Sequence, residues 1–390
     1  MAFISRHVSS LPAYLFSEFA RKKQKLQEKG VDVIDLGIGA PDLSPPEFVI
    51  DKLVEELGVA ENHRYSSYSG CKEFKEAVAS FYQRRYQVDL DPEEEVLALI
   101  GSKEGIAHLI QAVVDPGDKV IVPDPGYPVY EKAVHLTRGE MVRLPLDASH
   151  GFLPDFNRVP IHHAEQAKLM LLNYPGNPTA ATADKKAFLN AVTYAEKYHL
   201  AIANDAAYDL LTFGDYQSPS ILQIPGAKDR TVEFGSLSKS FSMAGWRIGY
   251  AVGNKEIIQG LATLKSNMDT SQFLPVQKAA AAALNSDLAS VEENNRIYQE
   301  RMEKMHTALR ELGIKAKKPR GTLFLWAEVP RGYRSMDFAD KLLEESGVIV
   351  TPGSAFGEGG EGYFRIALTV PAKRLEEVIR RWKRLGIGGG

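Results

Sequence analysis

Short apolar runs alternate with longer stretches of helical periodicity through the middle of the chain. The apolar runs lie at residues 96–100, 119–122, 169–172, 200–203, 232–235 and 248–252. Such runs, bounded by turn residues, are typical of strands buried on both faces, and helices between them indicate parallel crossovers. The pattern predicts an α/β fold whose large domain is a mostly parallel, doubly wound sheet covered by helices.

The two chain ends have a different pattern. Near the start, residues 13–29 predict a helix closed by Gly30, residues 31–36 a short strand, and residues 37–42 a turn-rich loop. Near the end, the pattern predicts a long helix that stops at Gly313, then two strands and a last helix, at residues 287–312, 322–328, 363–368 and 371–385.

These elements predict a smaller α+β domain beside the large sheet, built from both chain ends. We assign residues 1–45 to an N-terminal arm and part of the small domain. Residues 46–285 form the expected large, cofactor-binding domain, and residues 286–390 the C-terminal small domain.

Composition excludes several classes of protein. The 390 residues are 44% hydrophobic and 25% charged, as in ordinary globular proteins, and the formal net charge of −3 gives no basic excess for nucleic acid or an anionic membrane. No window is apolar enough to span a bilayer, and the first residues lack a signal-peptide pattern. The one cysteine, Cys71, has no partner for an internal disulfide, which favours a cytoplasmic location.

A lysine within GSLSKSFSMAGWRIGY, residues 235–250, is the main chemical candidate. Lys239 follows a predicted strand, and Arg247 lies eight positions later. A nucleophilic lysine must lose its proton, which burial near cationic groups promotes. Ser236 and Ser238 could bind a phosphate together with the planar guanidinium of Arg247. Taken alone, a surface lysine in a serine-rich loop explains the same string.

Polar residues follow other predicted strands. NYPGNPT, residues 173–179, is a tight turn that presents Asn177, and NDAAY, residues 204–208, places Asp205 at a buried strand end. A buried carboxylate needs a partner, although an aspartate there also serves as a helix N-cap. GSKEG, residues 101–105, opens a helix whose backbone N–H groups can bind phosphate. Arg365 interrupts an apolar strand and must be paired or exposed.

These strings occur in an order that resembles the class I/II aminotransferases, which are pyridoxal-phosphate enzymes of fold type I. The lysine signature is SLSK followed by GWRIG, and the resemblance extends from residue 39 to residue 365. It implies that pyridoxal 5′-phosphate is the cofactor, that Lys239 holds it as a Schiff base, and that Asp205 keeps its ring nitrogen protonated. Tyr208 and Asn177 then reach the phenolic oxygen, and Tyr127 of PDPGYP stacks on the ring.

The resemblance also assigns the two anionic ends of the ligands. Ser102 and Lys103 join Ser236, Ser238 and Arg247 around the cofactor phosphate, while Arg365, Gly39 and Asn177 bind the substrate α-carboxylate. Tyr65 matches a tyrosine that reaches the cofactor phosphate of the neighbouring subunit, so a homodimer with shared sites is expected. Lys239, Asp205 and Tyr208 are the implied catalytic residues, and an amino acid and a 2-oxo acid the substrates.

Four strings are most similar to the LL-diaminopimelate aminotransferase branch: LGIG, GSKEGI, PDPGYPVY and DAAY. That branch exchanges amino groups between LL-diaminopimelate and 2-oxoglutarate. The chain departs from its usual pattern at SMAGW, residues 242–246, and at Gly176, Ala180 and residues 265–273. Alanine, aspartate and aromatic aminotransferases therefore remain alternatives, and so does a C–S β-lyase on the same fold.

Overall fold

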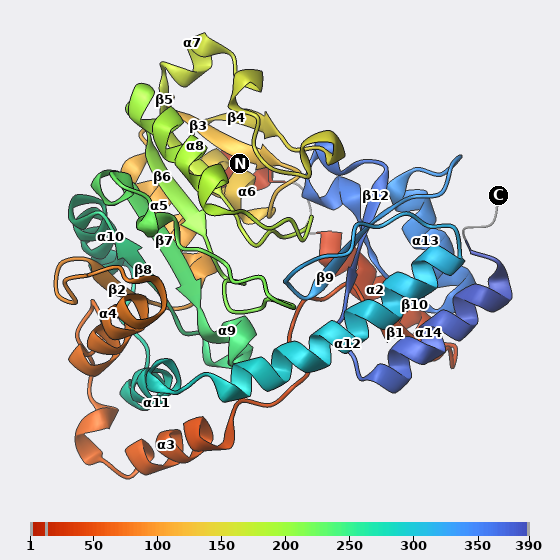
Figure 1. The fold of residues 1–390 in the computed structure, drawn as a ribbon, viewed down its shortest axis with the longest axis horizontal. Helices are drawn as coiled ribbons and strands as arrows, with labels where there is room; N and C mark the ends of the chain where they lie inside the picture. The colour runs from red at the N-terminus through yellow and green to blue at the C-terminus, as the bar shows by residue number, and fades with distance from the viewer. Residues whose placement is uncertain (1–2, 12–14, 388–390) are drawn as a thin grey trace.

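A seven-stranded sheet forms the larger lobe of the computed structural model, which describes residues 3–11 and 15–387 (Figure 1). In spatial order the strands are β2 (Val96–Leu99), β8 (Gly249–Gly253), β7 (Thr231–Ser236), β6 (Ala201–Asp205), β5 (Ala167–Leu172), β3 (Lys119–Asp124) and β4 (Glu140–Pro145). Strand β8 runs antiparallel to both neighbours, and the other pairings are parallel. The predicted mostly parallel α/β sheet is confirmed.

Strand β4 is the sheet element that the hydrophobic pattern did not predict. It lies at the sheet edge, pairs with β3 alone, and alternates between buried and more exposed positions. Glu140 is exposed and Arg143, which pairs with Asp124, is half-buried, so no continuous apolar run appears in the sequence.

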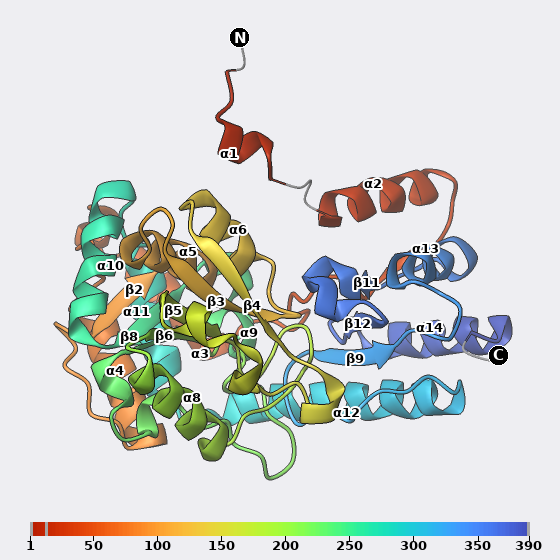
Figure 2. The same cartoon turned by 90° about the horizontal axis from the view of Figure 1, so that it is seen from above.

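Helices cover both faces of the sheet, because alternate strand residues enter different cores. Leu97 and Leu99 pack with helices α5 (Ser102–Val113), α6 (Val129–Leu136) and α10 (Lys255–Met268). Val96 and Ala98 face the opposite core, with α4 (Lys72–Tyr86), α8 (Lys185–Lys197) and α11 (Leu274–Asn285). Figure 2 shows the sheet running between α5, α6 and α10 on one side and α4 and α8 on the other.

The smaller lobe contains two short sheets. The strands β11 (Thr351–Pro352), β12 (Tyr363–Ala367) and β9 (Phe324–Glu328) are antiparallel, and β1 (Ile34–Asp35) pairs in parallel with β10 (Val348–Ile349). The helices α2 (Leu15–Glu28), α12 (Ala289–Glu311), α13 (Ser335–Ser346) and α14 (Ala372–Leu385) accompany them. A second hydrophobic core, separate from the sheet cores, joins Ile34 and Leu36 to C-terminal residues such as Trp382.

The predicted elements at the chain ends occur with shorter bounds. The strand expected at residues 31–36 extends only over Ile34–Asp35, since Asp32 instead pairs with Arg374 and Arg381 on α14. The expected first residue of the N-terminal helix, Ala13, lies outside the described residues. Among the described residues, no helix is long and apolar enough to cross a membrane.

Candidate active site

A cavity of about 680 Å³ opens at the carboxyl ends of the parallel strands, where β12 and the loop after β1 approach the large sheet. This is where ligands bind in open α/β sheets. The structure brings together twelve of the thirteen predicted site residues as lining of this cavity: Gly39, Ser102, Lys103, Tyr127, Asn177, Asp205, Tyr208, Ser236, Ser238, Lys239, Arg247 and Arg365. The thirteenth, Tyr65, is 91% exposed and does not line it.

Lys239 lies in the short helix α9 (Leu237–Ser240), directly after β7. Its Nζ donates a hydrogen bond to the Gly39 carbonyl oxygen at 2.7 Å, so the N-terminal loop touches the lysine. Burial, followed by the charges of Arg365 and Arg247, lowers the pKa of Lys239 to about 8. The amine therefore loses its proton far more readily than an ordinary surface lysine.

Asp205 closes β6 as a buried carboxylate. Tyr130 donates its hydroxyl to Asp205 Oδ2 at 2.8 Å, and the Ala207 backbone N–H donates to Oδ1 at 3.3 Å. Burial nevertheless raises the pKa of Asp205 to about 6, against these two hydrogen bonds and the charge of Lys239. The group holds a costly negative charge near neutral pH, as expected of a site that receives a cation.

An anion-binding corner lies at the other end of the cavity. Helix α5 begins at Ser102, so its first backbone N–H groups face the cavity mouth. Arg247 donates to the carbonyl oxygens of Ala244 at 3.0 Å and Ile100 at 3.3 Å, which orients its guanidinium beside this helix start. Gly101 has a positive φ of 80°, and a Cβ there would overlap Arg247. Glycine is thus required where the arginine crosses the strand-to-helix turn.

Arg365 is fully buried on β12 and is held from several sides. Its guanidinium donates to Asn177 Oδ1 and to the Gly37 carbonyl oxygen, both at 2.6 Å. It also lies over the rings of Phe324 and Phe356, at 4.2 and 4.8 Å from their centroids. Because the Asn177 oxygen accepts from Arg365, its amide nitrogen is the group left to donate toward the cavity.

The close approach of the Phe324 ring explains why residue 39 is a glycine. An added Cβ would lie 2.5 Å from Cζ of Phe324, a ring that is 1% exposed and cannot yield. The absence of a side chain lets the loop carry its carbonyl oxygen to Lys239. Both lobes therefore contribute backbone as well as side chains to one cavity.

Sequence reasoning missed Tyr130, the donor to Asp205. It lies three residues after Tyr127 in PDPGYPVY, one helical turn on, and the rings meet edge to face at 5.7 Å. The motifs gave Tyr130 no role, although the string that contains it was singled out. Phe324, Phe356 and Lys132 also line the cavity without a motif of their own. Their contributions depend on tertiary packing that the sequence does not display, since Phe324 lies on β9, Phe356 in a short helical turn and Lys132 on α6.

The fold and the cavity together define an α/β enzyme of the fold-type I class, with a buried lysine and a buried aspartate at the carboxyl ends of its strands. The sequence matches the family model described as aminotransferase class I and II over residues 31–381. The chain therefore belongs to the class I and II aminotransferase family, and it is an aminotransferase.

Relatives and solved structures agree with this assignment. The LL-diaminopimelate aminotransferase of Moorella thermoacetica is 49% identical over 381 residues, 98% of each chain. The enzyme of that name from Aquifex aeolicus is 48% identical, again over 98% of each. The substrate-bound BacF structure from Bacillus subtilis superposes with a TM-score of 0.96 at 37% identity, covering 100% of this chain and 99% of that one.

Proposed function

We propose that this enzyme is a pyridoxal-phosphate-dependent LL-diaminopimelate aminotransferase that uses 2-oxoglutarate as its partner substrate. The observation that carries the proposal is full-length similarity to relatives of that name, between 42% and 49% identical over 97–99% of this chain. The departures at Gly176, Ala180 and residues 242–246 leave the aminotransferases for alanine, aspartate and aromatic amino acids as the outcomes to test against.

The residues present fit pyridoxal phosphate. Asp205, a buried acid that forms no ion pair with a described lysine, arginine or histidine, suits a protonated ring nitrogen. The N-terminus of α5 would hold the phosphate together with Ser236, Ser238 and Arg247. Tyr127 and Ala207 line the cavity between these ends, where a flat ring would lie. When bound, the cofactor withdraws electrons from the substrate Cα, which makes its proton removable.

The protein's own groups position the substrate and move the proton. Arg365 binds the α-carboxylate through its planar fork, with the Asn177 amide nitrogen as a further donor. This orients the Cα–H bond, and such alignment lowers the barrier by several kcal/mol. Lys239, with its pKa of about 8, accepts the Cα proton on Nζ as the general base.

A second positive corner suits the far end of a dicarboxylic substrate. The cavity lining also includes Lys132 and Leu136 of α6, Leu11 of the N-terminal segment, and Lys103 beside Ser102 at the start of α5. Burial lowers the pKa of Lys132, with Glu131 acting against this shift and Lys103 adding to it. Both 2-oxoglutarate and LL-diaminopimelate carry a carboxylate at the end remote from the reacting carbon, which supports this substrate pair over alanine.

A panel of donors tests the assignment. The purified holoenzyme is mixed with LL-diaminopimelate, glutamate, aspartate, alanine or phenylalanine, and conversion of the cofactor spectrum is followed in single half-reactions. We expect LL-diaminopimelate and glutamate to react with the highest kcat/KM. A higher value for alanine, aspartate or phenylalanine would overturn the substrate assignment, and pyruvate with ammonia released without an acceptor would identify a lyase.

The Lys239→Ala variant tests the chemistry separately from the substrate. We expect it to bind cofactor yet lose steady-state transamination, with Lys186→Ala, a lysine on α8 outside the cavity lining, as the matched control. Retention of turnover by Lys239→Ala would refute its role as the base.

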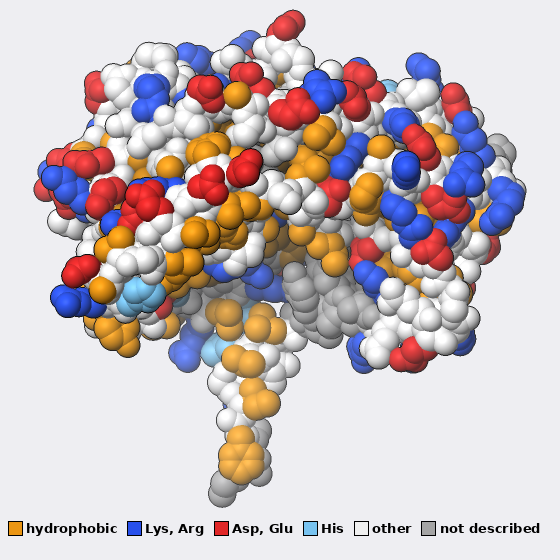
Figure 3. Space-filling view, turned by 90° about the horizontal axis from the view of Figure 1, so that it is seen from below, with side chains coloured by type: hydrophobic (Ala, Val, Ile, Leu, Met, Phe, Trp, Pro, Cys, Tyr) orange, Lys and Arg blue, Asp and Glu red, His pale blue; other side chains and the backbone are white. Residues whose placement is uncertain are grey.

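We further propose a homodimer in which Tyr65 enters the partner's site. Phe3, Val54 and Tyr65 are 100%, 62% and 91% exposed, and Phe48 and Leu57 add to this apolar surface. Figure 3 shows apolar side chains in a band across one face of the molecule and along the projecting N-terminal segment. Contiguous exposed apolar surface of this kind marks an interface. We expect the enzyme to sediment as a dimer, and we expect the Tyr65→Phe variant to bind the cofactor more weakly. Sedimentation as a monomer would contradict the proposal.

A further inference from the structure

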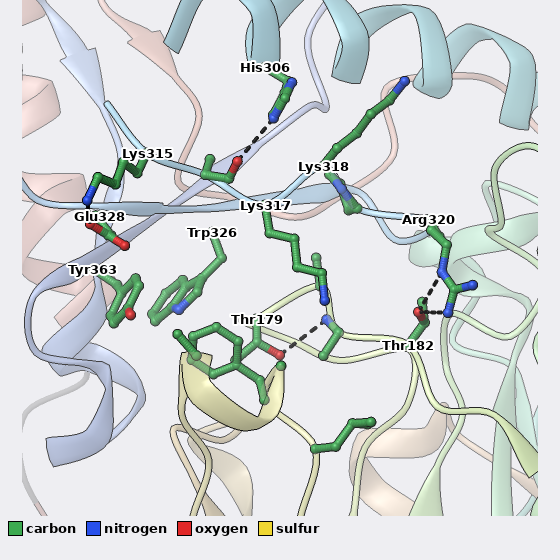
Figure 4. A pocket seen from close by; sticks show the side chains of 18 of the residues that line it. Thr179, Thr182, His306, Lys315, Lys317, Lys318, Arg320, Trp326, Glu328 and Tyr363 are labelled. Atoms are coloured by element: carbon green, nitrogen blue, oxygen red, sulfur yellow. Dashed lines mark hydrogen bonds and ion pairs between the residues drawn. The ribbon is translucent and has the colours of Figure 1, made fainter. Parts of the chain in front are cut away.

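A second cleft, of about 870 Å³, lies outside the cavity described above. It is bounded by residues 148–153 after β4, by the turn at residues 179–184, and by residues 306–320 at the end of α12 and beyond it. Trp326 of β9 and Tyr363 of β12 form one wall (Figure 4). The proposed reaction uses none of these side chains.

Positive charge dominates the lining. Five lysine and arginine side chains face two carboxylates: Arg310, Lys315, Lys317, Lys318 and Arg320 against Asp184 and Glu328. Asp184 is occupied as the N-cap of α8, where it accepts from the Ala187 backbone N–H at 2.8 Å. Glu328 lies 4.0 Å from Lys315, at the limit of an ion pair. The acids therefore neutralise only part of the lining charge.

Lys317 is the cation placed to meet a ligand. Within the described part of the chain it forms no ion pair, in contrast to Lys318, which pairs with Glu303 at 3.0 Å. Figure 4 shows its side chain extending into the cleft toward the turn that carries Thr179. A Cβ added to Gly151 would lie 3.4 Å from its Nζ, so the ammonium also approaches the opposite loop. Lys317 is itself exposed, and its ammonium group lies between two loops, within reach of an anion that enters the cleft.

The aromatic wall offers a further unsatisfied group. The Trp326 and Tyr363 rings stack at 5.2 Å with planes 9° apart, and Trp326 is only 4% exposed. Its indole Nε1 has no acceptor among the described residues, although a buried N–H without a partner is costly. Because this nitrogen is itself buried, the wall contributes aromatic surface to the cleft, and the lysine and arginine side chains contribute the donors.

The Trp326 side of the cleft also packs against residues that contact Arg365, the proposed ligand of the α-carboxylate. Trp326 is the register partner of Arg365 across the β9–β12 pair. Its ring meets Phe356 edge to face at 5.9 Å, and Phe356 in turn lies under the Arg365 guanidinium at 4.8 Å. Thr179 of the cleft is two residues from Asn177, which accepts from Arg365. Packed side chains therefore run continuously from the cleft to Arg365.

We propose that the cleft binds a small multivalent anion, a phosphorylated or polycarboxylic metabolite, and that its occupancy changes the affinity of Arg365 for the donor α-carboxylate. The ligand pairs with Lys317 and Arg320 and lies against Trp326. The coupling step rests on the proposed role of Arg365, whereas the binding step does not. A ligand that binds more tightly to one arrangement of the Trp326–Phe356 contact favours that arrangement. The affinity of Arg365 for the α-carboxylate then changes by the same free-energy difference.

Binding is tested on the holoenzyme, with inorganic pyrophosphate and citrate as probes that distinguish the two ligand chemistries. Isothermal titration measures affinity at constant ionic strength, and Trp326 fluorescence reports occupancy. Lys317→Glu should weaken the tighter probe at least tenfold, since an attraction becomes a repulsion. Lys72→Glu, at an exposed lysine outside the cleft lining, is the matched control and should leave affinity within twofold.

Two further variants separate this cleft from the catalytic cavity. Arg365→Lys should retain probe binding, and Trp326→Phe should abolish the fluorescence change while Trp246 and Trp382 remain. Saturating probe should alter KM for the donor at least twofold in the wild type and not in Lys317→Glu. Failure of both probes to bind, or equal affinity in Lys317→Glu, overturns the site. Binding with an unchanged KM overturns the coupling but leaves donor turnover, and hence the proposed function, intact.

Discussion

The hydrogen bond from Tyr130 to Asp205 gives the sharpest test of how the site holds its charge. Tyr130→Phe removes one hydroxyl from a side chain that is 1% exposed and preserves the ring that packs against Tyr127. The lost bond is 2.8 Å long and ends on a buried carboxylate. Such charge-assisted bonds contribute about 1.5–3 kcal/mol, which corresponds to about one to two pH units in an acid's pKa.

The direction of the Asp205 pKa shift in Tyr130→Phe depends on which protonation state the hydrogen bond stabilises. Tyr130 stabilises ionised Asp205, so its removal raises a pKa that burial already holds at about 6. More Asp205 is then protonated at neutral pH, and the proposed partner for the cofactor ring nitrogen is lost in that fraction. We expect the acid limb of kcat/KM to move upward by about one to two pH units, and cofactor affinity at pH 7 to fall about two- to tenfold as the ionised fraction of Asp205 decreases.

Tyr82→Phe is the matched control. Tyr82 is equally buried and donates to another buried carboxylate, Glu233, at 2.9 Å, but it packs in the core on the other face of the sheet. This variant should lower thermal stability and leave the pH profile unchanged. An acid limb at the wild-type position in Tyr130→Phe, measured from pH 5 to pH 9, would refute the reasoning.

Three other changes have defined outcomes. Asp205→Asn should stabilise the apo protein by up to about 3 kcal/mol at pH 8, because burial raises the Asp205 pKa from 3.8 to about 6. The apo wild type therefore loses this stability as the pH rises through 6, whereas the asparagine variant does not. In denaturant melts the difference between the two proteins should vanish below pH 4. Arg365→Ala should raise KM for all donors about a hundredfold, with less loss in kcat, and Arg365→Lys should recover only part because it lacks the fork; an unchanged KM would contradict the clamp. Gly39→Ala should lower kcat/KM and stability, the latter by about 1–3 kcal/mol, because its Cβ meets Phe324; Phe324→Leu should relieve the defect, and a fully active Gly39→Ala would show that the loop can move.

Motifs located the site well because the chemistry depends on residues that follow consecutive strands. Asn177 follows β5, Asp205 closes β6, and Lys239 follows β7. Parallel strands align their carboxyl ends at one edge, so residues scattered over sixty positions converge without any further information. The sequence pattern was therefore sufficient for this half of the cavity.

The other half depended on contacts that no periodicity reveals. Arg365 lies on a strand of the small lobe, and only the folded chain places its guanidinium on Asn177 and the Gly37 carbonyl oxygen. Strand β4 escaped prediction because an edge strand with one solvated face has no continuous apolar run. Tyr130 was indistinguishable from a core tyrosine until its hydroxyl was seen on Asp205.

The sequence by itself thus determined the fold class and the family resemblance, and it singled out Lys239 as the candidate reactive lysine, because alternating burial and local strings encode these features directly. The tertiary structure decided the charges: burial gives a lysine pKa near 8 and an aspartate pKa near 6, and Arg365, more than a hundred residues from Lys239 in the sequence, lowers the lysine pKa further. Desolvation and Coulomb energy depend on three-dimensional distance rather than on position along the chain, so only folding sets them.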